Sequence, residues 1–267
     1  MSDENGLQSV KIDLTEMQKP GLCAVHGEFT NRGLMGGRIW RGCPECAKVH
    51  EQERAQQELA IEALKKKTDW ERKMRIACIP DRYQDRTFDS FHASTKGQAE
   101  ALQISQTFAD DFPKLKGKGL IFCGLPGTGK THLANAICLH VMEHHKVTAV
   151  FTTVQKAIRR IKETWGKKSE ESEAEAISAF VYPALLVLDE IGVQFGSDTE
   201  KQLLFDILNE RYEQRKSTIL LSNLAVKEVI GFIGERIFDR LKEDGGQSVI
   251  FNWKSHRGQN ADSGSAQ

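Results

Sequence analysis

The sequence predicts an α/β protein, in which a large domain built on a parallel sheet follows a small metal-binding module and a long helix. A glycine-rich G-x-x-x-x-G-K-T segment covers residues 124–131, and apolar runs alternate with helical patterns from 119 to 221. Two pairs of Cys and His residues lie at 23–26 and 43–46. Alternation of this kind is typical of parallel sheets covered by helices on both faces.

Length and charge limit the possible classes of protein. A chain of 267 residues has room for one large domain and a small appendage. Its 37 basic and 37 acidic residues balance, so any nucleic-acid surface must be a local patch. No apolar stretch approaches the ~20 residues that span a bilayer, and the polar start does not resemble a signal peptide. We therefore expect a cytoplasmic protein with no membrane partner.

The amino-terminal part is expected to contain a zinc site. Residues 1–20 are polar and are predicted to be flexible, and a zinc-ribbon-like module is predicted over 21–50. Two ligand pairs, each with two residues between the ligands, are typical of a closed structural Zn²⁺ site. The fourth ligand is either His26 or His50, and His26 is the preferred candidate. The predicted ligands are Cys23, His26, Cys43 and Cys46.

The other three cysteines lie singly in apolar surroundings. Cys78, Cys123 and Cys138 are therefore expected to be reduced, buried thiols.

A long helix is predicted over residues 47–78, which are rich in good helix formers. Its apolar stripe is narrow, so it is either a solvated connector or a docking helix for a partner protein. Pro80 disfavours helical geometry in the residue before it, and the main domain is therefore expected to cover 79–257.

Within the main domain, each element follows from its periodicity. Strands are predicted at 119–123, 147–152, 185–188 and 218–221. Helices are predicted at 96–112, 131–145, 153–165 and 199–214, with a polar insert at 166–173 followed by a short helix.

The glycine-rich segment has the strand–loop–helix context of a phosphate-binding P-loop. Its glycines let backbone N–H groups face phosphate oxygens, and the following helix adds its positive N-terminal end. Lys130 would contact the β- and γ-phosphates, and Thr131 would ligate Mg²⁺. The predicted nucleotide-binding residues are Gly124, Leu125, Pro126, Gly127, Thr128, Gly129, Lys130, Thr131 and His132.

Acidic and amide side chains follow two later strands. Asp189 ends an apolar run and is predicted to orient Mg²⁺, and Glu190 to polarise the attacking water. Asn223 follows the next strand and can bridge that water and the γ-phosphate. The alternative for Asp189 and Glu190 is an acidic turn exposed to solvent.

These motifs carry a family resemblance. From residue 79 to about 257 the chain resembles the AAA+ helicase loaders of the DnaC type and, more loosely, the IstB group. The amino-terminal module departs from the DnaC pattern and is similar to that of loaders encoded by phages and prophages. The segments that carry the resemblance are 79–83, 124–131, 187–194, 222–223, 234–241 and 249–253.

The resemblance implies an AAA+ P-loop NTPase of the ASCE class, with a parallel five-stranded sheet, flanking helices and no C-terminal lid. It also implies self-association on ATP. Arg236 would then be an arginine finger for the neighbouring subunit, and Arg240 would contribute to nucleotide binding. Without the resemblance, both could equally lie on a solvated helix face. Arg257 is a weaker sensor candidate, and residues 258–267 are expected to be disordered.

A basic segment with one aromatic residue covers residues 156–168. Basic side chains attract phosphates and an aromatic ring can stack on a base, a combination typical of single-strand binding. The resemblance carries single-strand contacts over to Lys162, Trp165 and Ser197. The alternative is a solvated charged helix on which Trp165 shares the inner face with Ile158 and Ile161.

The combined prediction is an ATPase that loads a DnaB-type hexameric helicase onto single-stranded DNA, with ATP and Mg²⁺ as cofactors and Zn²⁺ as a structural ion. One alternative is an IstB-like regulator of a transposase. Another is a protein adaptor in which the nucleotide only stabilises the fold.

Overall fold

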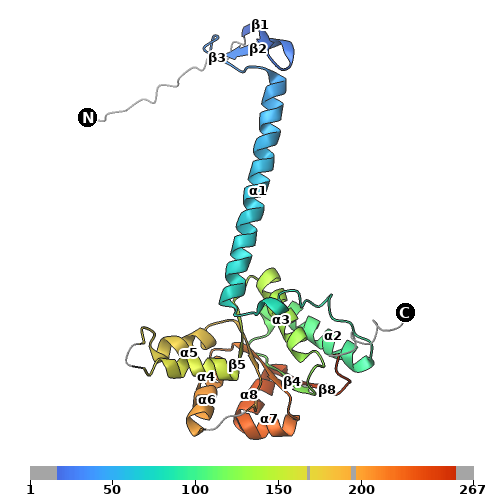
Figure 1. Ribbon diagram of the computed structural model, residues 1–267, viewed down its shortest axis with the longest axis vertical. Helices are drawn as coiled ribbons and strands as arrows, with labels where there is room; N and C mark the ends of the chain where they lie inside the picture. Colours follow the sequence, from blue (N-terminus) through green and yellow to red (C-terminus); the bar gives the residue numbers. More distant parts are fainter. Residues whose placement is uncertain (1–16, 167–168, 194–196, 257–267) are drawn as a thin grey trace, which may run out of the picture. The chain divides into compact units, whose positions relative to one another are not determined.

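The computed structural model describes residues 17–166, 169–193 and 197–256. The chain divides into two compact units, one ending at Asp69 and one beginning at Trp70 (Figure 1). The termini predicted to be flexible or disordered, 1–16 and 258–267, lie outside the described residues, as does Arg257.

The first unit contains a small antiparallel sheet. Its strands are β1 (Met17–Cys23), β2 (Gly27–Leu34) and β3 (Ile39–Trp40), in the order β1-β2-β3. Residues 17–20 were expected in the flexible terminus, but they belong to β1, where Met17 pairs with Gly33 and Pro20 with Thr30. The ordered module therefore begins earlier than the ligand spacing alone predicts.

Two aromatic rings of this sheet lie over glycines on the facing strands. Phe29 is paired with Gly21 and Trp40 with Gly33, and a Cβ on either glycine would come within 2.7 or 3.1 Å of the facing ring. Packing of a ring against a glycine fixes the register of the strands.

A single helix, α1 (Pro44–Ile76), follows the sheet and has 33 residues. Its residues 47–69 are all exposed. From residue 70 onward, in the second unit, the chain is no longer fully exposed. Met74 and Ala77 are buried in the core, and Trp70 packs against it. The main domain thus begins before residue 79, since the apolar residues at 70, 74 and 77 share one face.

The second unit is built on a five-stranded parallel sheet, as predicted. The strand order is β5-β6-β7-β4-β8, and the strands are β4 (Leu120–Gly124), β5 (Ala149–Thr153), β6 (Leu185–Asp189), β7 (Ser217–Ser222) and β8 (Gln247–Phe251). The central strands are buried on both faces, which explains their continuous apolar runs.

Helices cover both faces of this sheet (Figure 1). One core cluster joins the sheet to α2 and α3, and the other joins it to α4–α8. None of the described helices combines the length and apolar character needed to cross a membrane. The helices are α2 (Lys96–Asp110), α3 (Lys130–His144), α4 (Val154–Glu163), α5 (Glu173–Val181), α6 (Asp198–Glu213), α7 (Val226–Ile233) and α8 (Glu235–Lys242). Short 3₁₀ turns lie at Asp81–Tyr83, Phe112–Lys114 and Glu243–Gly245.

A buried cation ties three of these elements together. Arg211 of α6 is fully buried, and burial lowers its pKa to about 9, so it remains charged at neutral pH. Its guanidinium donates to carbonyl oxygens at the end of α5 and to the first residues of β7. These acceptors are the carbonyls of Phe180, Val181, Pro183 and Ser217 and the hydroxyl of Thr218.

Candidate functional site

The P-loop connects β4 to α3 and depends on its glycines. Gly124 has a φ of 135°, and a Cβ there would lie 2.2 Å from the Phe251 carbonyl oxygen. Gly129 has a φ of 98°, and its Cβ would meet the Phe91 ring at 2.7 Å. Only glycine allows this backbone shape and these close approaches.

Lys130 is the first residue of α3 and is almost fully buried. Its ammonium donates hydrogen bonds to the carbonyl oxygens of Gly124, at 2.7 Å, and Leu125, at 2.8 Å. These bonds hold the cation inside the curve of the loop, where the phosphates of a nucleotide are expected to lie.

The predicted Mg²⁺ ligands lie side by side. The Thr131 hydroxyl donates to Asp189 Oδ2 at 3.1 Å, and the Glu190 backbone N–H donates to Asp189 Oδ1 at 2.7 Å. Burial raises the pKa of Asp189, and these two hydrogen bonds act against the rise. Both side chains offer hard oxygen ligands of the kind that Mg²⁺ prefers.

The turn after β6 is strained and firmly held. Glu190 adopts a φ of 64°, which is unusual for a residue with a side chain and is often found at functional sites. The Ile191 N–H donates to the Leu221 carbonyl at 2.9 Å, and the Ser222 hydroxyl donates to the Ile191 carbonyl at 2.7 Å. Ser222 thereby fixes the acidic turn next to Asn223, a role that the sequence did not indicate.

Residues of the P-loop, the acidic turn and Asn223 line one cavity of about 630 Å³. It brings together the predicted Pro126, Gly127, Gly129, Lys130, Thr131, His132, Asp189, Glu190 and Asn223. Of the remaining predicted loop residues, Gly124 and Leu125 supply carbonyls to Lys130, while the buried Thr128 donates its hydroxyl to the Leu125 carbonyl at 2.7 Å.

The other wall of the cavity, formed by residues 82–92, was not predicted as part of the site. It contributes Arg82, Tyr83, Arg86, Ser90, Phe91 and His92, and His256, next to the P-loop, completes the lining. The only sequence signal for these residues was segment 79–83 of the family resemblance, which gave them no role.

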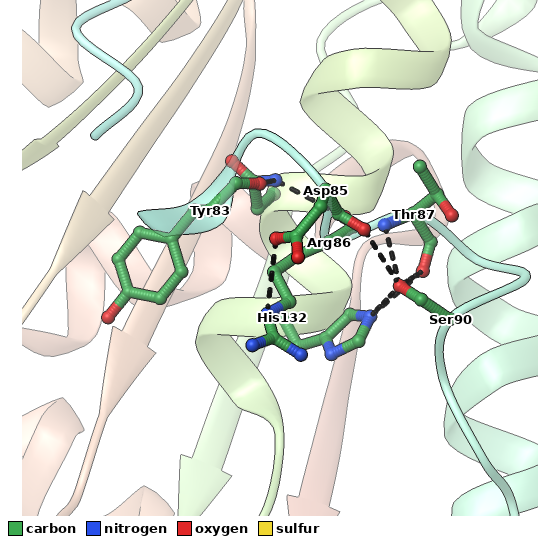
Figure 2. Close-up of polar contacts among 7 residues, drawn as sticks. Tyr83, Asp85, Arg86, Thr87, Ser90 and His132 are labelled. Atoms are coloured by element: carbon green, nitrogen blue, oxygen red, sulfur yellow. Dashed lines mark hydrogen bonds and ion pairs between the residues drawn. The ribbon is translucent and has the colours of Figure 1, made fainter. Parts of the chain in front are cut away.

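Two side chains of α3 hold this wall against the P-loop helix, and Figure 2 shows the contacts of one of them, His132, with Thr87 and Ser90. His132 Nε2 lies 2.8 Å from the Thr87 carbonyl oxygen and therefore donates to it, and the Ser90 hydroxyl lies 3.2 Å from the same nitrogen. Asn135 is fully buried and donates to the Tyr83 carbonyl at 2.6 Å. His132 was predicted to bind nucleotide; it lines the cavity, and its Nε2 contacts segment 87–90.

The chain after β8 braces the P-loop from the other side. The Trp253 indole N–H donates to the Thr128 carbonyl at 2.9 Å, and the His256 N–H donates to the Gly127 carbonyl at 3.0 Å. The P-loop is thus held between two segments that lie far from it in the sequence.

The two arginines of α8 lie away from this cavity. Arg236 is exposed. Arg240 lies over the Tyr212 ring at 4.5 Å and donates a hydrogen bond to Asn209. Neither lines the nucleotide cavity of its own chain.

The predicted DNA-contacting residues gather around α4. Lys162 forms an ion pair with Glu200 at 2.6 Å, and Ser197 caps α6 by accepting the Glu200 N–H. Trp165 is half exposed and its indole N–H donates to Glu173. The alternative that placed Trp165 on the buried face with Ile158 and Ile161 is wrong, because α4 ends at Glu163.

The four predicted zinc ligands converge in the first unit. The ligand atoms of Cys23, His26, Cys43 and Cys46 all lie within 4.8 Å of one another. Cys23 Sγ is 3.5 Å from Cys46 Sγ, and Cys46 Sγ is 3.3 Å from His26 Nδ1. Sulfur ligands around a tetrahedral Zn²⁺ lie about 3.7 Å apart, so the set fits this ion.

The alternative fourth ligand lies outside the cluster. His50 Nδ1 contacts Glu53 at 3.3 Å instead. Within the cluster, N–H groups of Val25 and His26 lower the pKa of Cys23 to about 6, while the hydrogen bond to Cys23 raises the pKa of Cys46 to about 11.

Two of the three single cysteines are buried as expected. Burial raises the pKa of Cys123 to about 11 and also raises that of Cys138. The prediction for Cys78 is wrong, since its side chain is exposed although Ala77 and Ile79 on either side are buried. Its φ of 56° turns it outward after the end of α1.

Most of the chain matches a known protein family. Residues 48–257 match the family of IstB-like ATP binding proteins, a region that starts after the last cluster ligand, Cys46. The replicative helicase loader DnaC of Escherichia coli K12 is 34% identical over 175 residues, covering 66% of this chain and 70% of that protein. DnaC of Buchnera aphidicola subsp. Baizongia pistaciae is 31% identical over 202 residues, covering 74% and 81%.

A crystal structure of the DnaC helicase loader has a TM-score of 0.58 and 27% identity, covering 64% of this chain and 99% of that one. The predicted fold and family are therefore confirmed. The chain belongs to the family of IstB-like ATP binding proteins, and its relatives include the DnaC replicative helicase loaders.

Proposed function

We propose that this protein is an ATP-dependent loader that places a DnaB-type hexameric helicase on single-stranded DNA. One observation carries the proposal: Lys130, Thr131, Asp189, Glu190 and Asn223 line one cavity in a chain that is 34% identical to a replicative helicase loader. The protein would act in the cytoplasm.

The cavity has the groups needed for ATP hydrolysis. The P-loop N–H groups and Lys130 would bind the phosphates, and Lys130 would exchange its two carbonyl contacts for phosphate oxygens. Thr131 and Asp189 would hold Mg²⁺, which neutralises charge on the phosphates. Glu190 would accept a proton from the attacking water, and Asn223 would orient that water.

The remaining wall would receive the ribose and base. Because the P-loop fixes the phosphates at one end, Arg82, Tyr83, Arg86 and His92 are left to face the nucleoside. His132 and Asn135 hold the backbone of this wall in place.

Self-association would complete the site. Arg236 is exposed and lies outside the cavity of its own chain, which suits a guanidinium offered to the γ-phosphate of a neighbouring subunit. Arg240, held by Asn209 and Tyr212, would support the same helix at that interface.

The amino-terminal cluster would hold Zn²⁺ through Cys23, His26, Cys43 and Cys46. With all four positions filled by protein, the ion would be structural and would stabilise a sheet that has almost no buried core.

A second candidate function comes from the family match itself. The matching family is IstB-like, so a regulator that binds a transposase and duplex DNA would use the same ATP site. The two functions differ in their protein partner and in the form of DNA that they bind.

Native mass spectrometry with a DnaB-type helicase, with and without ATP, tests the proposal. A complex of one hexamer with several copies of this chain is expected. Absence of a complex, together with ATP-dependent binding to duplex DNA, would favour the transposase regulator. Lys130→Ala should abolish loading onto a single-stranded circle; loading at the wild-type rate would instead favour an adaptor with a structural nucleotide.

A further inference from the structure

Three residues in and just after α4, two basic and one aromatic, have a common property. Each of the three contacts a carboxylate from a neighbouring segment. Helix α4 packs against both α5 and α6, and the carboxylates lie just before α5, at its start, and in the first turn of α6. The pairs are Arg160 with Glu171, Trp165 with Glu173, and Lys162 with Glu200.

The first pair is bidentate. Arg160 Nε lies 3.1 Å from Glu171 Oε2, and a terminal guanidinium nitrogen lies 2.5 Å from Oε1. The guanidinium also lies 5.7 Å from the centroid of the Phe180 ring, within the range of a cation–π contact. The pair is accessible, with side-chain exposures of 45% and 34%. This is the fork geometry in which arginine also binds phosphate.

The second pair links α4 to α6, whereas the first links α4 to the segment before α5. Lys162 Nζ is 2.6 Å from Glu200 Oε1, with side-chain exposures of 35% and 22%. Glu200 belongs to the helix that Ser197 caps. The ammonium therefore already has an anionic partner at the position predicted to contact DNA.

The third pair involves the aromatic residue. The Trp165 indole N–H donates to a Glu173 carboxylate oxygen, yet the residue remains 50% exposed. An indole that is anchored by its edge and open to solvent can stack on a base.

The three donors are a guanidinium, an ammonium and an indole N–H, and all of them point at carboxylate oxygens. A phosphate oxygen satisfies the same donors, so each carboxylate occupies a place that a phosphate can take. We propose that Arg160, Lys162 and Trp165 form one single-strand surface on which carboxylates occupy the phosphate positions, so that DNA binds by displacing them. This inference rests on the proposed function and adds Arg160 to the DNA surface.

In this mechanism, the carboxylates and the phosphates of single-stranded DNA compete for the same three donors. The isolated protein binds DNA weakly because each contact costs an existing ion pair or hydrogen bond. Any event that draws the carboxylates away, such as docking of a basic partner surface, strengthens DNA binding without adding a contact. A purely structural pairing makes a different prediction, because it only fastens α5 and α6 to α4.

Substituting each partner of one ion pair in turn distinguishes these two interpretations. We would measure binding of the full-length protein to a fluorescent oligothymidine at low salt for Glu171→Gln and Arg160→Gln. Competition predicts about two- to five-fold tighter binding for Glu171→Gln and weaker binding for Arg160→Gln. A structural pair predicts no more than the net-charge effect of each substitution, which the control variant measures.

The matched control is Glu163→Gln, which removes the same charge from an exposed position of α4 itself. Its smaller effect measures the general electrostatic contribution. Glu200→Gln provides a second test, because competition predicts tighter DNA binding for this variant too.

Unchanged or weaker binding in both Glu171→Gln and Glu200→Gln overturns the inference. If those variants still associate with the helicase and hydrolyse ATP, the proposed function stands and only the displacement mechanism is lost. If the wild type also fails to associate with the helicase, the proposed function itself has failed.

Discussion

The Thr131 hydroxyl donates a hydrogen bond to Asp189 Oδ2 over 3.1 Å, although β7 separates their strands in the sheet. Thr131 is the second residue of α3, which follows the P-loop, and Asp189 ends β6. The two predicted Mg²⁺ ligands thus lie within hydrogen-bond distance of each other.

This arrangement predicts opposite effects of Asp189→Asn on stability and on activity. Burial raises the pKa of Asp189, so the folded state binds more protons than the unfolded state between the ordinary and the raised pKa. Stability therefore falls as pH rises through this window, and the ionised carboxylate is destabilising at neutral pH. The amide should raise the melting temperature of the nucleotide-free protein and abolish Mg²⁺-dependent hydrolysis.

Thermal unfolding and phosphate release at several pH values check this prediction. Asp206→Asn, at an exposed position of α6, is the matched control and should change neither. A lower melting temperature for Asp189→Asn at neutral pH would show that its hydrogen bonds outweigh the cost of burial.

Arg236→Ala should remove ATP hydrolysis and leave ATP binding intact, because the guanidinium lies outside the cavity of its own chain. The most informative measurement is the ATPase activity of a mixture of two inactive variants. Lys130→Ala protein retains the finger and Arg236→Ala protein retains the P-loop, so a mixture should recover part of the activity that each lacks alone. Failure to recover, or equal loss of binding and hydrolysis, would argue against action in trans.

Cys46→Ser should remove zinc, measured by elemental analysis of the purified protein, and unfold the amino-terminal sheet. The ligand atoms of Cys46 and His26 are 3.3 Å apart, so loss of one ligand disrupts the set. His50→Ala is the control, because His50 contacts Glu53 outside the cluster. Equal zinc content in Cys46→Ser and wild type contradicts the site.

Arg211→Met should lower the free energy of unfolding by about 3 kcal/mol, since it leaves buried acceptors without donors. Denaturant unfolding monitors this loss. The exposed Arg215→Met should have a far smaller effect. Similar losses for both would mean that the carbonyl contacts of Arg211 contribute little.

The sequence predicted those parts of the site that depend on local patterns. The P-loop, the acidic strand end and the Cys/His pairs each combine a short motif with a recognisable element, and the structure brings each set together. The parallel sheet followed from its apolar runs. Local reasoning failed where a helix boundary decided the outcome: α4 ends at Glu163, so helical periodicity no longer applied to Trp165.

Contacts between distant segments could not be predicted in this way. Trp253 and His256 reach the P-loop only after β8 has joined the sheet beside β4. Likewise, the wall around Tyr83 and Arg86 depends on Asn135 of α3. No periodicity or spacing in the chain indicates these pairings, because they arise from tertiary packing.

The bracing of the P-loop by Trp253 and His256 bears on how the protein is made in the cell. The ribosome synthesises the P-loop long before it reaches either residue. A nascent chain that has already displayed its glycine-rich loop therefore still lacks these two contacts. The final shape of the loop depends on residues that are synthesised well after it.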